Sequence, residues 1–359
     1  MPQSDSLAEG SRILTVCNAC RYCEGYCAVF PALEKRPIHA ADLYYLANLC
    51  HNCAECYYAC QYAPPHPFQV NVPQVLAQIR LDSYQHYARP RFLFSNSGKL
   101  ALATLAVALA AGFAAEVDSF ARPAAFYDVI PHSVMTAIFS VAGILTLIAF
   151  AASFSKVSPM PKATLPALVR AFGSILTLRY LSSGGAGCTY PDSRHSQARR
   201  WFHHFTFYGF LLCFASTSVA AWYHYALALR APYPYLSPPV ILGMLGGAGL
   251  LIGPAGLYWL KLRRDPAIED LRQDGFDIAF LTLLFSASLT GLLLLTLRAS
   301  ALMKSLLVIH LATVLALFAT LPYGKFVHGI YRAAALLRYA ASQPARRERG
   351  DPLRQGGTD

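Results

Sequence analysis

The chain has 359 residues, of which 55% are hydrophobic and only 14% are charged, and its formal net charge is +11. This composition and the mean hydropathy of +0.37 exclude an ordinary soluble domain and predict a membrane protein. The N-terminal stretch has no apolar run of the length that a secretory signal needs, so we expect it to stay in the cytoplasm. Reducing conditions there favour a metal or catalytic role for clustered cysteines over disulfides.

Eight of the ten cysteines fall in two copies of one spacing, C-x2-C-x2-C-x3-C. The copies read CNACRYCEGYC from residue 17 and CHNCAECYYAC from residue 50. Three thiolates at three-residue steps fit three corners of a cubane iron-sulfur cluster, and in the bacterial two-cluster arrangement the fourth cysteine binds the other cluster. The spacing therefore predicts two [4Fe-4S] clusters, one held by Cys17, Cys20, Cys23 and Cys60 and the other by Cys50, Cys53, Cys56 and Cys27.

Two further observations bear on this metal assignment. The ferredoxin pattern places proline directly after the fourth cysteine, whereas Ala28 and Gln61 stand there in this chain, which leaves the number of ligands unchanged. Structural zinc is the alternative, but three thiols at steps of three crowd a single tetrahedral ion. Of the two isolated cysteines, Cys213 is expected to pack within a helix, and Cys188 is either a reactive thiol or a bystander.

Beyond residue 92 the composition becomes apolar, and six segments approach the roughly 20 residues that span a bilayer. They cover approximately residues 98–117, 133–153, 202–226, 238–260, 276–297 and 303–327. Cytoplasmic loops carry an excess of Lys and Arg. Of the 30 basic residues, only Arg122, Arg230, Arg298 and Lys304 fall in loops on the outer side. This bias predicts that both termini are cytoplasmic.

Two stretches need separate interpretation. Residues 161–181 carry Leu and Ile at helical spacing and form either a helix along the membrane surface or a cap helix packed on the first domain. The fourth apolar segment contains GMLGGAGLLIG, which resembles a nucleotide-binding loop but follows no strand. Its pairs Gly243/Gly247 and Gly249/Gly253 lie one helical turn apart, a pattern that lets helices or a flat cofactor approach the backbone.

Histidines in the apolar segments form the second candidate site, because an imidazole inside a bilayer is costly and usually functional. The last segment carries His310 and His328, eighteen residues apart, which predicts one helix face with the two rings about 27 Å from each other. The third segment carries His203 and His204 near its inner end and His224 near its outer end.

The third and sixth segments run in opposite directions, so His203 or His204 is level with His328, and His224 is level with His310. Each pair fits the two axial positions of a b-type haem in a helical bundle. One or two b-type haems are therefore expected, with His203 preferred over His204 on helical phase.

Residues at the ends of these helices are candidates for quinone contacts. They are His132, Tyr323 and Lys325, and the alternative for each is an ordinary interfacial residue. The whole chain is expected to be mainly α-helical, with a cytoplasmic two-[4Fe-4S] ferredoxin-like domain followed by a six-helix transmembrane cytochrome b-like bundle. The boundaries are 1–92 for the first domain, 93–340 for the haem-binding bundle with a cytoplasmic loop at 154–200, and 341–359 for a disordered basic tail.

The last segment, IHLATVLALFATLPYGKFVHGIYR, resembles the final haem-bearing helix of nitrate reductase gamma-type cytochromes b. The chain from Cys17 to Tyr339 resembles the tricarballylate (citrate) utilisation protein B family. The resemblance rests on the double cysteine module and on the stretches RRWFHHFTFYGFLLCFASTSVAAWYHY, APYPYLSPPVILGMLGGAGLLIGPAGL and LPYGKFVHGIYRAAALLRY.

The resemblance implies a multi-pass protein of the bacterial inner membrane that transfers electrons and has no catalytic residues of its own. It would reoxidise the reduced FAD of a separate tricarballylate dehydrogenase and pass electrons through the clusters and haem to the quinone pool. The partner flavoprotein would oxidise tricarballylate to cis-aconitate. Membrane lipid and quinone are the other expected partners, and no nucleic-acid partner is expected.

Two other functions share these sequence features. One is a membrane redox subunit of a heterodisulfide-reductase-like or other anaerobic dehydrogenase complex, which would have the same cofactors and a different electron donor. The other is a redox sensor in which the helices only anchor the clusters. The identity of the electron donor distinguishes the first alternative from the tricarballylate system. The absence of haem would favour the redox sensor.

Overall fold

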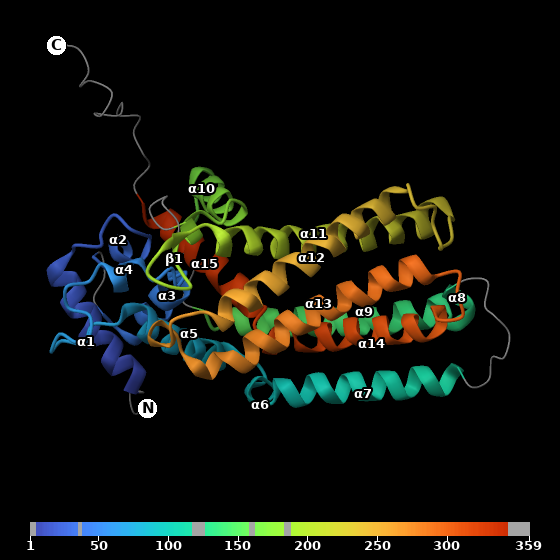
Figure 1. Cartoon of the computed structure of the whole chain (residues 1–359), viewed down its shortest axis with the longest axis horizontal. Helices are drawn as coiled ribbons and strands as arrows, with labels where there is room; N and C mark the ends of the chain where they lie inside the picture. The colour runs from blue at the N-terminus through green and yellow to red at the C-terminus, as the bar shows by residue number, and fades with distance from the viewer. Residues whose placement is uncertain (1–4, 35–37, 117–125, 158–161, 183–187, 344–359) are drawn as a thin grey trace, which may run out of the picture.

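The computed structural model describes residues 5–34, 38–116, 126–157, 162–182 and 188–343, which are almost entirely helical (Figure 1). A unit of shorter helices lies at one end, and a bundle of long helices extends from it (Figure 1). This arrangement confirms the expected mainly α-helical fold with six long apolar helices. Arg122 and most of the predicted tail lie outside the described residues.

The N-terminal unit consists of α1 (Asp5–Cys20), α2 (Val29–Leu33), α3 (Ala40–Leu49), α4 (Glu55–Tyr58), α5 (Val72–Tyr87) and α6 (Arg91–Ser95). Its core is built from leucines on three helices, such as Leu14, Leu43 and Leu76, which are almost completely buried. Ala335 and Leu336 of α15 (Val327–Ser342) join the same core. The last helix of the chain therefore holds the N-terminal unit against the end of the bundle.

The bundle contains six helices that are long and apolar enough to cross a membrane. They are α7 (Ser97–Glu116), α9 (His132–Phe154), α11 (Ala198–Leu227), α12 (Pro238–Leu262), α13 (Asp274–Leu297) and α14 (Met303–Thr320). Large apolar side chains point outward from them: Leu102 on α7 is 70% exposed and Leu147 on α9 is 68% exposed. Because lipid is the solvent that suits such a surface, the chain is a membrane protein.

Helices α11 and α12 pack backbone to backbone through glycines. Gly246 and Gly249 of α12 face Gly209 of α11, and Gly253 faces Thr206. A Cβ atom at any of these glycines would overlap the neighbouring helix. The glycine-rich stretch is thus a helix-packing face, as its small-residue spacing predicts.

The last apolar segment is not one continuous helix, which corrects the expectation from the histidine spacing. Helix α14 ends at Thr320, a short 3-10 turn η4 (Leu321–Tyr323) follows, and α15 begins at Val327. Pro322 lacks the N–H that a helix interior requires, and Gly324 adopts an extended conformation. His310 and His328 therefore lie on different helices. The eighteen residues between them do not form five continuous helical turns, so their side chains need not share one helix face.

Helix α10 (Leu165–Leu176) has one of its two predicted roles, that of a cap helix, and a place along the membrane surface stays a prediction. Ala167 and Ala171 pack on Ala340 of α15, so the helix caps the region where the last helix meets the N-terminal unit. Its other face exposes apolar side chains, with Leu165 72% and Val169 63% exposed.

The remaining short elements lie at the two ends of the bundle (Figure 1). At the far end, α8 (Phe126–Val129) packs against the start of α14. At the end next to the N-terminal unit lie the 3-10 turns η1 (Arg179–Ser182), η2 (Pro266–Ile268) and η3 (Leu271–Gln273), and the antiparallel strands β1 (Cys188–Thr189) and β2 (His195–Ser196). The hairpin contacts the cysteine region directly, because Thr189 Oγ1 donates a hydrogen bond to the carbonyl of Cys53 at 3.1 Å.

Candidate redox site

The first predicted cysteine set lies around one open cavity of about 260 Å³. Its lining includes all four predicted thiols, Cys17, Cys20, Cys23 and Cys60. The last turn of α1 supplies the first two, and the loop that follows supplies the third. That loop is turned by Arg21, whose φ of 57° is left-handed. Cys60 arrives from the segment after α4.

The second predicted set lines a smaller and more enclosed space. Cys27, Cys50, Cys53 and Cys56 all border it, together with His51 and Tyr180. Cys50 and Cys53 are buried, and the left-handed residues Asn52 and Ala54 turn the backbone between the thiols. The fold therefore brings the eight thiols to two neighbouring cavities, with Cys56 lining both, and the division into two exchanged ligand sets stays a prediction.

The distances between thiols favour a large group over a single ion. Within the described parts of the chain, no three cysteine sulfurs lie within 4.8 Å of one another. A tetrahedral zinc site, with Zn–S bonds of about 2.3 Å, needs sulfurs roughly 3.8 Å apart. Burial raises the pKa of Cys17 to about 12, and the nearby Cys60 contributes further. Metal binding would thus displace protons from these thiols.

Three arginines lie beside the second set, and one of them, Arg199, has a carboxylate, Glu269, among its electrostatic neighbours. Arg80 and Arg332 both donate to the carbonyl of Cys50, at 2.8 and 2.9 Å, and Arg199 donates to the carbonyl of Asn52 at 2.6 Å. None of the three forms an ion pair within the described residues. Buried cations need anions nearby, and a cluster held by four thiolates is an anion. The charge balance around Cys50 therefore fits an iron-sulfur cluster.

His203 and His328 face each other where α11 meets the start of α15. Their ring centres lie 6.1 Å apart with an interplanar angle of 28°. An iron held between two imidazoles sets the ring centres roughly 6 Å apart, because each metal–nitrogen bond is about 2 Å long. His328 Nδ1 lies 2.5 Å from the carbonyl of Lys325, a contact that leaves Nε2 as the coordinating atom. This geometry fits axial haem ligation.

The environment of these rings supports the same conclusion. Burial, with smaller contributions from Arg332 and Lys325, lowers the pKa of His328 to about 3, so the ring is neutral as a metal ligand must be. The buried Nδ1 of His203 has no hydrogen-bond partner among the described residues. His204 lies elsewhere, stacked on Tyr208 at 5.7 Å.

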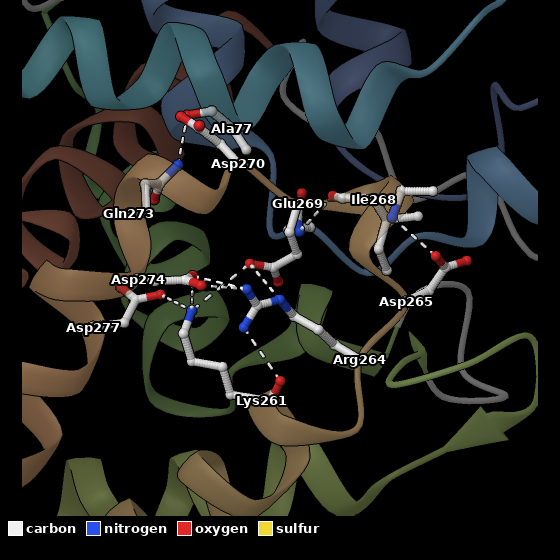
Figure 2. A network of polar contacts seen from close by, with 12 residues as sticks. Ala77, Lys261, Arg264, Asp265, Ile268, Glu269, Asp270, Gln273, Asp274 and Asp277 are labelled. Atoms are coloured by element: carbon white, nitrogen blue, oxygen red, sulfur yellow. Dashed lines mark hydrogen bonds and ion pairs between the residues drawn. The ribbon is translucent and has the colours of Figure 1, made fainter.

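A cavity of about 150 Å³ separates the histidine pair from the arginines. Its charged lining consists of Arg80, Arg199, Lys261, Lys325, Arg332, Glu269 and Asp277. Carboxylates and lysines at its floor form a closed network, part of which Figure 2 shows. Lys261 Nζ lies 2.7 Å from Asp277 and 2.9 Å from Asp274. This network was not predicted from the sequence.

The acidic part of this network is not a metal site. Glu269, Asp274 and Asp277 bring their oxygens within 4.8 Å of one another. Lys261 and Arg264 already lie among these oxygens and neutralise them (Figure 2). The arrangement is a salt-bridge network that fastens the end of α12 to the start of α13.

At the far end of the bundle the structure differs from the expected pairing. His224 stacks on His132, with ring centres 3.7 Å apart, a spacing too short for an iron between them. His310 instead contacts α13, where its Nδ1 lies 3.1 Å from Thr290 Oγ1 and its ring rests on Gly291. Among the described residues, the rings of His224 and His310 therefore do not contact each other as the predicted pairing would require.

The two isolated cysteines are both enclosed. Cys213 lies against Gly246 in the contact between α11 and α12, which confirms its packing role. Cys188 is fully buried, and its Sγ donates to the carbonyl of Leu181 at 2.5 Å. Such a thiol is closed to solvent reagents, so of its two predicted roles the structure supports the bystander.

Comparison with known proteins identifies the family and supports the iron-sulfur part of this description. Residues 10–86 match the family model described as the citrate utilization protein B Fer4-like domain, and residues 89–350 match the model for citrate utilization protein B. Citrate utilization protein B of Escherichia coli is 46% identical over 361 aligned positions, which cover 96% of this chain and 94% of that protein. No solved structure matches the chain. With both family models and this relative covering nearly its whole length, the chain belongs to the citrate utilization protein B family.

Proposed function

We propose that this protein is a membrane-bound electron carrier between a flavoprotein dehydrogenase and the quinone pool. It reoxidises the reduced FAD of a tricarballylate dehydrogenase and passes the electrons through two [4Fe-4S] clusters and b-type haem to quinone. The Fer4-like domain supports an iron-sulfur electron-transfer role, and membership of the citrate utilization protein B family supports a partner in citrate or tricarballylate metabolism.

The observation that carries this proposal is the linear order of the candidate centres. The first thiol set includes the exposed Cys20, and the second includes the buried Cys50 and Cys53. Arg332 then joins Cys50 to α15, the helix on which His328 faces His203. These contacts support a route from the exposed thiol set through the buried one to the histidine pair at the end of the membrane helices.

Each group has a defined task along this route. The clusters would be held by the two exchanged cysteine sets and would supply one-electron carriers. The haem would be held by His203 and His328 and would supply a one-electron carrier inside the membrane. The chain keeps the second thiol set away from water, surrounds it with positive charge and fixes the orientation of His328 through Lys325. A second haem at His224 and His310 remains a prediction from the sequence.

The proposal includes a location and an orientation. The protein belongs in the bacterial inner membrane with both termini in the cytoplasm, because nearly all of its basic residues fall on that side. The exposed first thiol set then faces the compartment that contains a soluble flavoprotein. We keep the domain division at 1–92 and 93–340, with the addition that α15 packs into the core of the N-terminal unit.

Optical and EPR spectra of the anaerobically purified full chain test the cofactor content. The proposal predicts a haem Soret band and the signals of two reduced [4Fe-4S] clusters in one preparation. Clusters without haem would favour a redox sensor. Clusters and haem that accept no electrons from the tricarballylate-reduced flavoprotein would favour an electron-transfer subunit with a different donor.

A further inference from the structure

A further cavity, of about 270 Å³, lies at the end of the bundle next to the N-terminal unit. It is enclosed by the start of α7, the start of α13 and the turn η4. Its lining consists of Ser95, Ser97, Gly98, Ala101, Arg272, Gly275, Phe276, Ala279, Phe280, Leu283, Thr320, Gly324 and Lys325. Two phenylalanine rings and a leucine make most of its inner wall apolar, with Lys325 at its base.

The cavity opens between two helices that contact lipid. Gly98 on α7 and Gly275 and Ala279 on α13 are all exposed. A Cβ atom at Gly98 or at Gly275 would meet no other atom within 4 Å. These small residues leave a gap between the two helices, through which a molecule dissolved in the membrane reaches the cavity without crossing water.

Lys325 forms the wall between this cavity and the one that contains the histidine pair, since it lines both. Its ammonium group binds Asp277 Oδ1 at 2.6 Å and Gln273 Oε1 at 2.9 Å. An ammonium has three N–H donors, so one remains for a ligand. Its backbone carbonyl lies 2.5 Å from His328 Nδ1, so a residue that lines this cavity also contacts one of the two proposed haem ligands.

The charge of Lys325 indicates what kind of acceptor it would bind. Asp277 already neutralises this ammonium. Arg272, the other cation of the lining, pairs with Asp270 at 3.0 Å, so the cavity presents a hydrogen-bond donor and little net positive charge. A neutral carbonyl suits it better than a phosphate or carboxylate. Aromatic walls such as Phe276, which stacks on Phe94 with ring centres 5.0 Å apart, suit a flat ring system.

We propose that this cavity binds the head group of a quinone, with one carbonyl accepting a hydrogen bond from Lys325 Nζ and the isoprenoid tail leaving between α7 and α13. The proposal rests on the function given above, because it locates the site of the electron acceptor named there. It assigns Lys325 a binding role and places the acceptor on the same side of the membrane as the N-terminal unit.

A pair of cavity-filling variants tests this assignment in the full chain. Gly275→Leu and Ala279→Phe both add side-chain volume at the opening. Gly143→Leu is the matched control, because a Cβ atom at Gly143 on α9 also meets no atom within 4 Å. The probe is the fluorescent quinone analogue 2-heptyl-4-hydroxyquinoline N-oxide, and the readout is quenching of its fluorescence on binding to the protein in lipid nanodiscs.

The expected result is at least tenfold weaker probe binding for Gly275→Leu and for Ala279→Phe, unchanged binding for the control, and wild-type cofactor spectra for all three. Wild-type affinity in both cavity-filling variants would overturn this site and leave the proposed function standing. Failure of the wild-type protein to bind the probe, and to be oxidised by ubiquinone or menaquinone analogues, would overturn the quinone acceptor and therefore the proposed function as well.

Discussion

Arg332 donates a hydrogen bond to the carbonyl oxygen of Cys50 at 2.9 Å, across 282 residues of sequence. One helical turn earlier on α15, His328 faces His203. One short helix thus contacts both the second thiol set and the histidine pair. The interface between the N-terminal unit and the bundle is therefore part of the proposed electron route as well as a structural contact.

Substitution of Arg332 by Gln is expected to lower the reduction potential of the second cluster by about 40–90 mV. A positive charge favours the reduced, more negative cluster, and its removal at this range is worth roughly 1–2 kcal/mol. An EPR-monitored redox titration measures the shift. The control is Arg338→Gln, which removes an equal charge from the same helix at a side chain that binds Asp42. Equal potentials in wild type and Arg332→Gln would contradict this electrostatic role.

The exchange of Cys27 and Cys60 between the two sets predicts a pattern of iron loss. Cys27→Ser and Cys50→Ser are expected to reduce the same cluster signal, because both residues belong to the second predicted set. The variant that carries both substitutions is therefore expected to lose no more iron than the more affected of the two single variants. Cys27→Ser combined with Cys17→Ser affects both clusters, so the two losses add. Iron content per chain and EPR line shape are the measurements. If instead Cys27 and Cys17 act on one cluster, the exchanged ligand sets are wrong.

His203 and His204 are neighbours in sequence with different expected roles. His203→Ala is expected to abolish the bis-histidine haem signature, because only His203 faces His328. His204→Ala is expected to retain it, since that ring stacks on Tyr208. Low-spin haem EPR and the Soret band distinguish the two variants. Haem loss in His204→Ala with retention in His203→Ala would reverse the assignment.

The glycine face of α12 is expected to contribute to the stability of the bundle. Gly253→Ala places a Cβ atom against Thr206 and the carbonyl of Phe202, an overlap that costs about 1–3 kcal/mol. Gly143→Ala adds the same atom where nothing lies within 4 Å and is expected to have little effect. Thermal unfolding in detergent compares them. A Gly253→Ala variant as stable as Gly143→Ala would show that the helices separate at little cost.

Local patterns in the sequence were sufficient for the features that depend on short spacing. The C-x2-C-x2-C-x3-C repeats predicted that the eight thiols gather in two groups, although Cys56 lines both cavities, and the apolar runs predicted the six long helices. The preference for His203 over His204 also followed from helical phase, because α11 is continuous from Ala198 to Leu227.

Features that depend on tertiary contacts or on a break in a helix were not predictable in this way. Helical phase fails across Pro322 and Gly324, so the relation between His310 and His328 was wrong. The arginines around Cys50 come from α5, α11 and α15, and no sequence window contains them together. Likewise, the stacking of His132 on His224 joins the starting end of α9 to the finishing end of α11.

The most direct test of the account is electron delivery followed optically in the anaerobic full-length protein. The purified membrane protein is mixed with the proposed partner flavoprotein and tricarballylate, and a ubiquinone or menaquinone analogue is added afterwards. The account predicts that the clusters and the haem become reduced on the first addition and reoxidised on the second. Clusters and haem that stay oxidised when the partner flavin is fully reduced would contradict it.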